Sequence, residues 1–285
     1  LEITGTLSDT KSKYGNIERT SLDKTATVSV TGENGRLILQ SDGDITLKAA
    51  DITSKGTIAA EAKELNITTA NIKNKEHYNG NADNYYRLDQ KSEIGSRLKG
   101  NNGVTLIAEN EVILRQAEIT SPNGNVTVAA KQGDIKVEAG RTEERLAWAV
   151  KSTRRGFLNK TTEKQRYVHN ISEAVGSNLD GKNVSLIAEQ GNISIKGSAA
   201  VAENNLTIAA KQDISILADK NTYFRDEKTE RKKSGLMGTG GIGFTLGAKK
   251  EQVEQDRTQQ SAARSQVGSL NGDSKILAGK HYQQT

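Results

Sequence analysis

A repeat of 80 residues constrains the fold of this chain more than any other feature of its sequence. The segment 125–132 returns almost unchanged as 205–212, and Val104 and Val184 stand at matching positions upstream, again 80 residues apart. An eight-residue match at a constant spacing is not expected by chance. Repetition at a fixed period predicts a stack of similar units in which each unit contacts only its neighbours.

A shorter period of 22 residues, from Val104 to Val126, lies within the long repeat. Between these positions, short runs of apolar residues alternate with Thr, Ser or Lys, and turns rich in Gly, Asn and Asp separate the runs. Alternation turns one face of each run inward and the other toward water. The pattern predicts an all-β fold, a right-handed parallel β-helix (solenoid). An antiparallel sandwich is the competing fold, but it does not explain the fixed long period.

The composition supports a thin, extended core. Hydrophobic residues make up 34% and aromatic residues 4% of the chain, and the mean hydropathy is −0.64. Typical globular domains are about 45–50% apolar. The absence of cysteine from the sequence excludes disulfides and thiolate chemistry.

Polar stretches separate the repeated strand pairs, and we expect them to project from one side of the shaft as β-hairpin arms. Three of them begin with Lys followed by Tyr two or three residues on, at Lys75, Lys220 and Lys280. The matching returns contain Val or Ile, Gly and Ser, at 94–96, 175–177 and 267–269. We therefore expect one continuous repeat domain, 1–285, with rung pairs at about 31–74, 99–141, 181–219 and 271–280 and arms at about 1–30, 75–98, 142–179 and 220–270.

Three arms invite more specific expectations. The stretch 230–251 reads almost the same in both directions around a Gly-rich middle, which is typical of a long hairpin with polar stalks. Residues 1–30 are expected to hold the returning half of a further arm. Helical or disordered arms remain alternatives, because stalks rich in Gln and Glu have little β-propensity; the segment 142–150 is the one most readily seen as a helix.

We expect no catalytic, cofactor-binding or metal-binding residue in this chain. The segment 238–243 matches G-x-G-x-x-G, but a dinucleotide site needs a buried strand before it and a helix after it. His77, His169 and His281 are far apart in the sequence. Lys and Arg total 40 against 35 Asp and Glu, with mixed signs, so nucleic-acid binding is not expected either.

Apolar side chains on the arms are the candidate contacts with a membrane or a protein partner. They occur on otherwise solvated stalks, where no core of their own is expected. The candidates are Leu236, Met237, Ile242, Phe244, Leu246, Trp148 and Phe157. Packing within the arms is the plainer interpretation of the same residues.

The repeats resemble the haemagglutinin repeats of filamentous haemagglutinin/CdiA-type exoproteins. The resemblance is carried by the strand motifs 184–189 and 205–210 and by the arm motif 232–238. It implies a Gram-negative, secreted cell-surface protein exported through an outer-membrane two-partner transporter. The chain starts without Met or a signal peptide, and 121–124 only approximates the Asn-Pro-Asn-Gly motif of the family's secretion domain. We therefore expect an internal fragment with neither export signal nor toxin.

Three functions follow from these expectations. The first is a β-helical shaft that displays adhesive or toxin modules together with arms that face a host or target cell, and for which a surface receptor is a candidate partner. The second is a segment of a contact-dependent growth inhibition toxin that engages the target cell's outer membrane. A β-helix polysaccharide-degrading enzyme is a remote third. Open rung edges also predict end-to-end self-association of the fragment.

Overall fold

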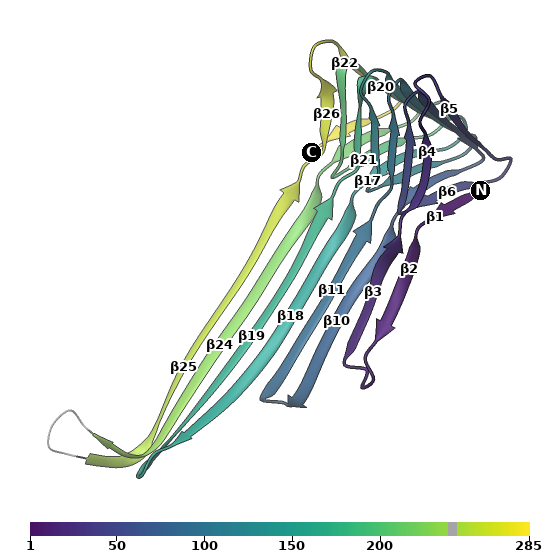
Figure 1. Cartoon of the computed structure of the whole chain (residues 1–285). Coiled ribbons are helices and arrows are strands. Elements are labelled where there is room, and N and C mark those ends of the chain that lie inside the picture. The colour runs from purple at the N-terminus through teal and green to yellow at the C-terminus, as the bar shows by residue number, and fades with distance from the viewer. Residues whose placement is uncertain (239–243) are drawn as a thin grey trace.

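The computed structural model describes residues 1–238 and 244–285, which form 28 β-strands and no helix. These strands make three sheets, designated A, B and C. Sheets A and C wrap into a shaft, and sheet B extends away from one side of it (Figure 1). No helix long and apolar enough to cross a membrane occurs in the part of the chain that the structure describes.

Each turn of the shaft contributes one strand to sheet A and two strand segments to sheet C, one in each of its two rows. Sheet A is parallel and has the order β1 (Glu2–Thr4), β6 (Ile45–Lys48), β9 (Leu65–Thr68), β14 (Val112–Arg115), β17 (Ile135–Glu138), β21 (Ile193–Lys196), β23 (Ile214–Leu217) and β28 (Tyr282–Gln284). Sheet C has two parallel rows. The first row is β4 (Ala26–Val30), β7 (Ala50–Ser54), β12 (Arg97–Gly100), β15 (Glu118–Ser121), the first parts of β20 (Asn178–Ala188) and β22 (Ala199–Ala210), and β26 (Gln266–Ser269). The second row is β5 (Arg36–Gln40), β8 (Thr57–Ala62), β13 (Gly103–Ala108), β16 (Asn125–Ala130), the second parts of β20 and β22, and β27 (Ser274–Ala278).

Equivalent residues of successive turns pair directly, as the repeats predict. Val104 pairs with Val126, Val126 with Val184, and Val184 with Leu206. All four side chains are buried, so each turn is covered by the turns on either side of it. The all-β class and the parallel β-helix are thereby confirmed.

The core is one side chain deep, which reconciles a folded chain with a low apolar content. Inward positions along sheets A and C hold Ile, Leu and Val, each contributing about 1.5–3 kcal/mol when fully buried. From β8 to β27, the inward position that ends the second row of sheet C holds alanine in an unbroken column. Its members are Ala62, Ala108, Ala130, Ala188, Ala210 and Ala278.

The corner between sheet A and the first row of sheet C alternates between a tight turn and a hairpin. The tight turns place Ala49, Gln116 and Gly197 in the left-handed region, with φ of 48°, 48° and 58°. At the same corner of every other turn the chain leaves the shaft and returns. A hairpin therefore occurs once in every two turns.

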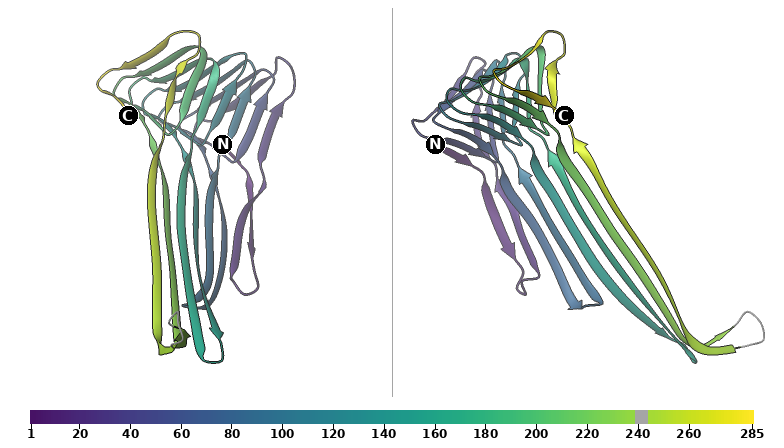
Figure 2. Two further views of the ribbon diagram at one scale, coloured as in Figure 1. Left: turned by 90° about the vertical axis from the view of Figure 1, so that its left-hand side faces the viewer. Right: turned by 180° about the vertical axis from the view of Figure 1, so that it is seen from behind.

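The four hairpins pair side by side to form sheet B, which is antiparallel throughout. In order, its strands are β2 (Thr6–Lys11), β3 (Ile17–Lys24), β10 (Ala70–Asn81), β11 (Asn84–Ile94), β18 (Gly140–Arg155), β19 (Asn159–Val175), β24 (Asp219–Gly238) and β25 (Phe244–Ala263). The arms lengthen from the N-terminal to the C-terminal end of the shaft (Figure 2).

Matching spacings explain why separate hairpins join into one sheet. Neighbouring strands lie about 4.8 Å apart, so two turns of the shaft and the two strands of one hairpin have the same width. One hairpin in every two turns therefore places each arm at pairing distance from the next. The 80-residue period is two turns plus one arm.

Several expected boundaries and elements differ from the structure. Residues 1–30 contain a complete hairpin, β2 and β3, between shaft strands β1 and β4 rather than half of an arm. The segment 142–150 is part of strand β18, not a helix, because pairing with β11 and β19 outweighs its weak β-propensity. The last arm ends at Ala263, and 266–270 already belongs to the shaft. Lys280 precedes shaft strand β28 and begins no arm.

Candidate interaction surface on the arms

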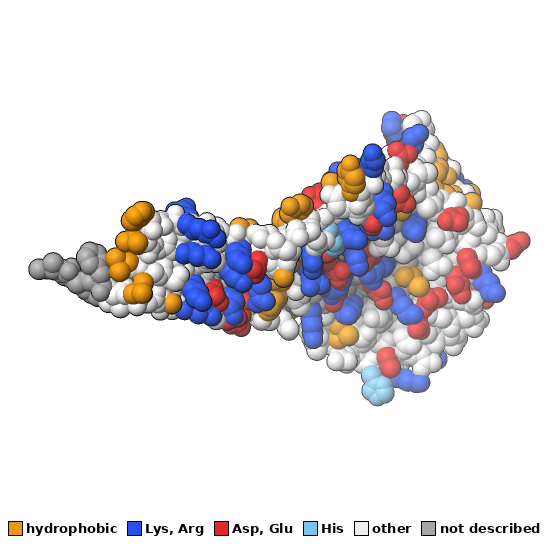
Figure 3. All heavy atoms as spheres, turned by 90° about the horizontal axis from the view of Figure 1, so that it is seen from below, with side chains coloured by type: hydrophobic (Ala, Val, Ile, Leu, Met, Phe, Trp, Pro, Cys, Tyr) orange, Lys and Arg blue, Asp and Glu red, His pale blue; other side chains and the backbone are white. Residues whose placement is uncertain are grey.

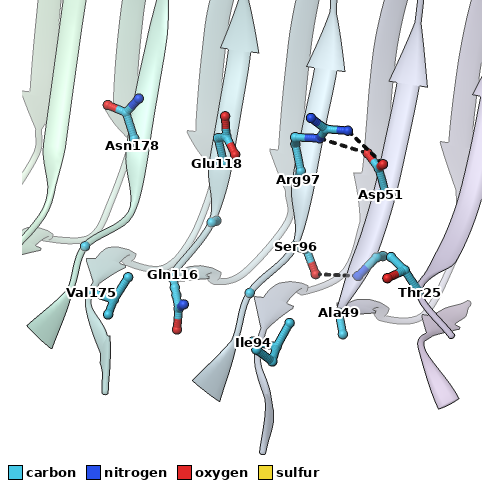
Figure 4. A pocket seen from close by; sticks show the side chains of 14 residues that line it. Thr25, Ala49, Asp51, Ile94, Ser96, Arg97, Gln116, Glu118, Val175 and Asn178 are labelled. Carbon is cyan, nitrogen blue, oxygen red and sulfur yellow. Dashed lines mark hydrogen bonds and ion pairs between the residues drawn. The ribbon is translucent and has the colours of Figure 1, made fainter. Parts of the chain in front are cut away.

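The bases of the arms border a groove of about 550 Å³ (Figure 4). Arg97 donates two hydrogen bonds to Asp51 on the neighbouring turn, at 3.0 and 2.8 Å. The Ser96 hydroxyl accepts a hydrogen bond from the backbone N–H of Ala50 at 3.1 Å. These contacts join one turn to the next, so we interpret the groove as a structural joint between arms and shaft.

A column of serines marks the points where the chain turns into sheet C. The Ser177 hydroxyl accepts from the backbone N–H of Ala117 at 2.9 Å, and the Ser265 hydroxyl donates to the backbone oxygen of Leu217 at 2.6 Å. Ser265, rather than the Ser269 of the repeated Val-Gly-Ser motif, is therefore the third return point. The Val-Gly-Ser letters at 267–269 lie four residues beyond the structural return at 263–265.

Two ion pairs anchor the arms at their bases. Arg115 on β14 donates two hydrogen bonds of 2.6 Å to Glu93 on β11, and Arg141 on β18 donates to Asp219 on β24 at 2.8 Å. Asp219 and Glu93 are mostly shielded from water. Partly buried, hydrogen-bonded pairs of this kind fix orientation more firmly than exposed pairs do.

A chain of polar contacts crosses the arms on one face of sheet B. Arg19 on β3 donates to Asn74 at 3.2 Å, Asn74 to Gln90 at 3.1 Å, and Gln90 to Glu144 at 2.6 Å. The other oxygen of Glu144 lies 2.7 Å from Nε2 of His169 on β19. The hydrogen bonds from Gln90 and then from His169 lower the pKa of Glu144. This network joins three arms and was not apparent from the sequence, because its members are far apart along the chain.

Trp148 lies in an aromatic row on the same face. Tyr78 pairs with Tyr86, Tyr86 with Trp148, and Trp148 with Tyr167. The rings of Trp148 and Tyr167 stack at 5.7 Å between centroids. Trp148 is half-buried within the sheet and packs inside the arms.

Each shorter arm ends on the flank of the next longer arm. The backbone N–H of His77 donates to the oxygen of Asn16 at 2.7 Å, and that of Leu236 donates to the oxygen of Leu158 at 2.9 Å. At the turn of the second arm, Asp83 accepts from Lys164 and Lys151 of the third arm at 2.8 and 3.0 Å, and these two cations lower its pKa. The arms therefore form one continuous sheet, in which the strands lengthen from the first arm to the last.

The other candidate apolar residues gather at the free ends of the two longest arms. Phe157 is fully exposed, and Leu246 on β25 is 80% exposed. Leu246 lies opposite Leu236, and Met237 lies opposite Thr245. Phe244 begins β25 opposite Gly238, and Ile242 falls outside the described residues. The hydrogen bond from Leu236 to Leu158 connects the end of one arm to the other.

A basic cluster lies directly behind these apolar residues, at the narrow end of the molecule in Figure 3. It comprises Arg154, Arg155, Lys160, Lys232, Lys233, Lys249 and Lys250. Lys232 lies opposite Lys250, and Lys233 opposite Lys249. Lys249 pairs with Glu251 at 2.6 Å and Lys250 with Glu230 at 2.9 Å, whereas the other five form no ion pair within 4.0 Å among the described residues. Like charges directly opposite each other destabilise a sheet, so their presence requires another explanation.

The histidines each contact a single carboxylate and are dispersed. His77 lies 2.9 Å from Asp89 on the second arm, and His281 lies 3.1 Å from Asp213 on the shaft. Among residues 1–238 and 244–285, no group of three or more His, Asp or Glu side chains is arranged to hold a metal ion. The motif 238–243 lies almost wholly outside the described residues.

Comparison with known proteins identifies the repeats. Residues 158–281 match the family model described as Hemagglutinin repeat. The chain is 38% identical over 158 residues to the 16S rRNA endonuclease CdiA of Enterobacter cloacae, a match that covers 52% of this chain and 5% of that protein. It is 24% identical over 265 residues to the tRNA nuclease CdiA-2 of Burkholderia pseudomallei, which covers 89% of this chain and 8% of the relative.

The match is confined to a small part of each relative. The chain spans about a twentieth of the length of the curated relatives that it matches. No solved structure matches the chain. The family match over residues 158–281 and the relatives agree with the strand and arm motifs, and they support a region similar to filamentous haemagglutinin/CdiA-type exoproteins.

Proposed function

We propose that this region is a structural and interaction segment of a secreted Gram-negative exoprotein. In this proposal the shaft holds adhesive or toxin modules away from the cell, and the arms face a host or target cell. The single observation that supports it is the in-register stacking of every turn from β1 to β28. At about 4.8 Å per turn, sheet A extends for roughly 34 Å.

The segment itself is proposed to be non-enzymatic. The nuclease activities belong, by their printed names, to relatives of which this chain covers about 5%. The matched part is the Hemagglutinin repeat. Export through an outer-membrane two-partner transporter follows from the family and is likewise part of the proposal.

Labelling on intact cells tests this function. A cysteine introduced at Val253, an exposed position on β25, should react with a membrane-impermeant maleimide in the full-length exoprotein. The same substitution at Val184, which is fully buried, is the matched control and should not react. Labelling of Val253→Cys should require the partner transporter. Absence of labelling in cells that export the protein would contradict the proposal.

A second candidate function is contact of the arm ends with an outer membrane. The observation that favours it is the order of groups along the arms: exposed Phe157 and Leu246 at the free ends and the basic cluster behind them. A basic residue near an anionic lipid surface contributes about 1 kcal/mol. The apolar residues would enter the interfacial region, where their burial adds to this attraction. This arrangement explains why the arm tolerates opposed lysines.

Sedimentation with lipid vesicles tests the second function. The chain should bind vesicles that contain phosphatidylglycerol and lose most of that binding when the salt concentration is raised from 0.05 to 0.5 M. The double variant Phe157→Ala/Leu246→Ala should bind several-fold more weakly. Leu277→Ala is the control, because Leu277 is 58% exposed but lies on the shaft. Equal weakening by Leu277→Ala, or no binding by the unmodified chain, would reject membrane contact by the arm ends.

A further inference from the structure

Part of the basic cluster lies together on one face of sheet B, near the free ends of the two longest arms. Strands β18, β19, β24 and β25 pair there without a bulge, so opposed residues share a face with residues two positions along each strand. Arg155 lies opposite Lys160 on β19. Lys160 in turn lies opposite Ser234 on β24, and Lys232 lies opposite Thr162 on β19. All five side chains therefore lie on the same face.

Two lysines and two hydroxyls on this face form a square, which we call the arm-end square. Lys160 and Lys232 occupy one diagonal of the square, and Thr162 and Ser234 occupy the other. The Cβ atoms of directly opposed residues lie about 4.5–5.5 Å apart. Residues two positions apart along a strand are separated by about 7 Å. A small anion above the square is therefore within reach of two ammonium groups and two hydroxyl donors.

No carboxylate balances the square within its own two rows of paired residues. Across the four strands, these rows also contain the cations Arg155 and Lys250, and they contain neither Asp nor Glu. Lys250 pairs at 2.9 Å with Glu230, which lies in the next row toward the shaft. Arg155, Lys160 and Lys232 form no ion pair within 4.0 Å among the described residues. The square is therefore a concentration of positive charge without an internal counter-ion.

The opposite face of the same strands is more evenly charged. Its two corresponding rows hold carboxylates as well as cations. The cations are Arg154, Arg231, Lys233 and Lys249, and the carboxylates are Glu163 and Glu251. The excess of positive charge is consequently greater on the face that carries the square.

The square lies on the same face as two apolar side chains at the arm end. Leu236 follows Ser234 by two residues along β24 and lies opposite Leu246, so both leucines share the face of the square. At about 3.4 Å per residue, the leucines lie about 7–14 Å beyond the square. Amphipathic segments at a membrane surface bury their apolar side about 5–10 Å deep. Insertion of the leucines to that depth would place the square at the level of the lipid headgroups.

We propose that the arm-end square binds a phosphate monoester, presented by a lipid headgroup. At pH 7 a phosphate monoester carries a charge of about −1.5 to −2 and has three strong acceptor oxygens, which match the two ammonium groups and two hydroxyls of the square. A phosphodiester carries only a single charge and has fewer free oxygens. This inference rests on the second candidate function, contact of the arm ends with a membrane, and adds the chemistry of the headgroup that is recognised.

Sedimentation with two kinds of vesicle of equal zeta potential tests the proposal. One kind contains phosphatidic acid, whose headgroup is a phosphate monoester, and the other contains phosphatidylglycerol, a phosphodiester. The unmodified chain should bind the phosphatidic acid vesicles about tenfold more tightly, the value of one additional hydrogen bond to a charged group. Lys160→Gln/Lys232→Gln should abolish this preference. Arg154→Gln/Lys233→Gln removes the same charge from the opposite face and is the matched control: it should weaken binding to both kinds of vesicle equally and keep the preference.

A second variant separates the hydroxyls of the square from its charge. Thr162→Val/Ser234→Ala removes both hydroxyls and keeps every charge. It should weaken binding to phosphatidic acid vesicles several-fold and leave binding to phosphatidylglycerol vesicles unchanged. Circular dichroism shows whether each variant retains the fold.

The outcomes distinguish the phosphate site from membrane contact itself. Equal binding of the unmodified chain to both kinds of vesicle, or loss of the preference in the control variant, would overturn the proposal and leave membrane contact standing. If neither vesicle is bound, phosphorus NMR with inorganic phosphate decides. Binding of phosphate that Lys160→Gln/Lys232→Gln abolishes would keep the phosphate site and reject both its lipid source and membrane contact. Absence of phosphate binding as well would overturn the proposal entirely.

Discussion

Val126 of β16 pairs directly with Val184 of β20, although a complete hairpin arm lies between them in the sequence. The next pair, Val184 and Leu206, is joined by a tight turn. The stack continues unchanged through both kinds of connection. The arms are therefore insertions at one corner of the shaft, and their spacing is set by the shaft.

Truncation of a core side chain should weaken the whole stack. Leu186 is fully buried in the second row of sheet C, so Leu186→Ala should lower the free energy of unfolding by about 2–5 kcal/mol. Ile38→Ala is the matched control, because Ile38 is 57% exposed, and it should change stability by less than about 0.5 kcal/mol. Urea unfolding monitored by circular dichroism measures both. Equal effects of the two changes would contradict the assignment of the inward face.

A methyl group at the arm return should be poorly tolerated. A Cβ on Gly95 would overlap the backbone oxygen of Gln116, which the tight turn holds in place. Gly95→Ala should therefore destabilise the chain by about 1–3 kcal/mol. Gly268→Ala is the control, since a Cβ there meets nothing within 4 Å. If thermal melting shows no difference between the two variants, the close contact between arm return and tight turn is wrong.

The polar network across the arms predicts a dependence of stability on pH. The hydrogen bonds from Gln90 and His169 lower the pKa of Glu144 below its ordinary value of 4.5. A lowered folded-state pKa means that the unfolded chain takes up the proton first as the pH falls. The stabilisation by ionised Glu144 is therefore complete above about pH 4.5 and is lost as the pH falls through the folded-state value.

Unfolding measured between pH 3 and pH 7 tests this dependence. Glu144→Gln should flatten the profile below pH 4.5 and leave its shape above that value unchanged. Glu143→Gln alters the adjacent exposed carboxylate and should leave the profile as it is. A profile that Glu144→Gln does not change would show that the network makes no contribution.

Lysines lie opposite each other on the longest arm. We therefore expect a substitution that removes this repulsion to stabilise the arm and to weaken its binding to membranes. Lys233 lies opposite Lys249, so Lys233→Glu should stabilise the longest arm by about 0.2–1 kcal/mol. The same change should weaken vesicle binding, because it reverses one charge of the basic cluster. Hydrogen exchange along β24 and β25 measures the first effect and vesicle sedimentation the second. If Lys233→Glu increased both the stability of the arm and its binding to vesicles, the basic cluster would not be the part that binds membranes.

The sequence predicted the shaft better than the arms for a physical reason. Rung strands alternate apolar and polar residues because one face is buried, and Val104 and Val126 reveal their period directly. Arm strands contribute no side chain to the core of the shaft, so β18 carries no comparable pattern. Their boundaries depend on partners in other arms, which is why the return at Ser265 was misplaced and the network through Glu144 was missed. Of the candidate contacts, Phe157 is fully exposed, whereas Trp148 packs against Tyr167.

Two deletions test the central claim, that arms and shaft share one two-turn period. Removal of 104–183 takes out one 80-residue repeat and keeps the remaining arms two turns apart. The product should fold, melt cooperatively and be shorter by about 10 Å in small-angle scattering. Removal of 104–125 takes out a single turn and leaves two hairpins one turn apart. The two strands of a hairpin would then have to fit into the width of one strand. The smaller deletion should therefore lose far more stability than the larger one, and equal or greater stability of the 104–125 deletion would contradict the account.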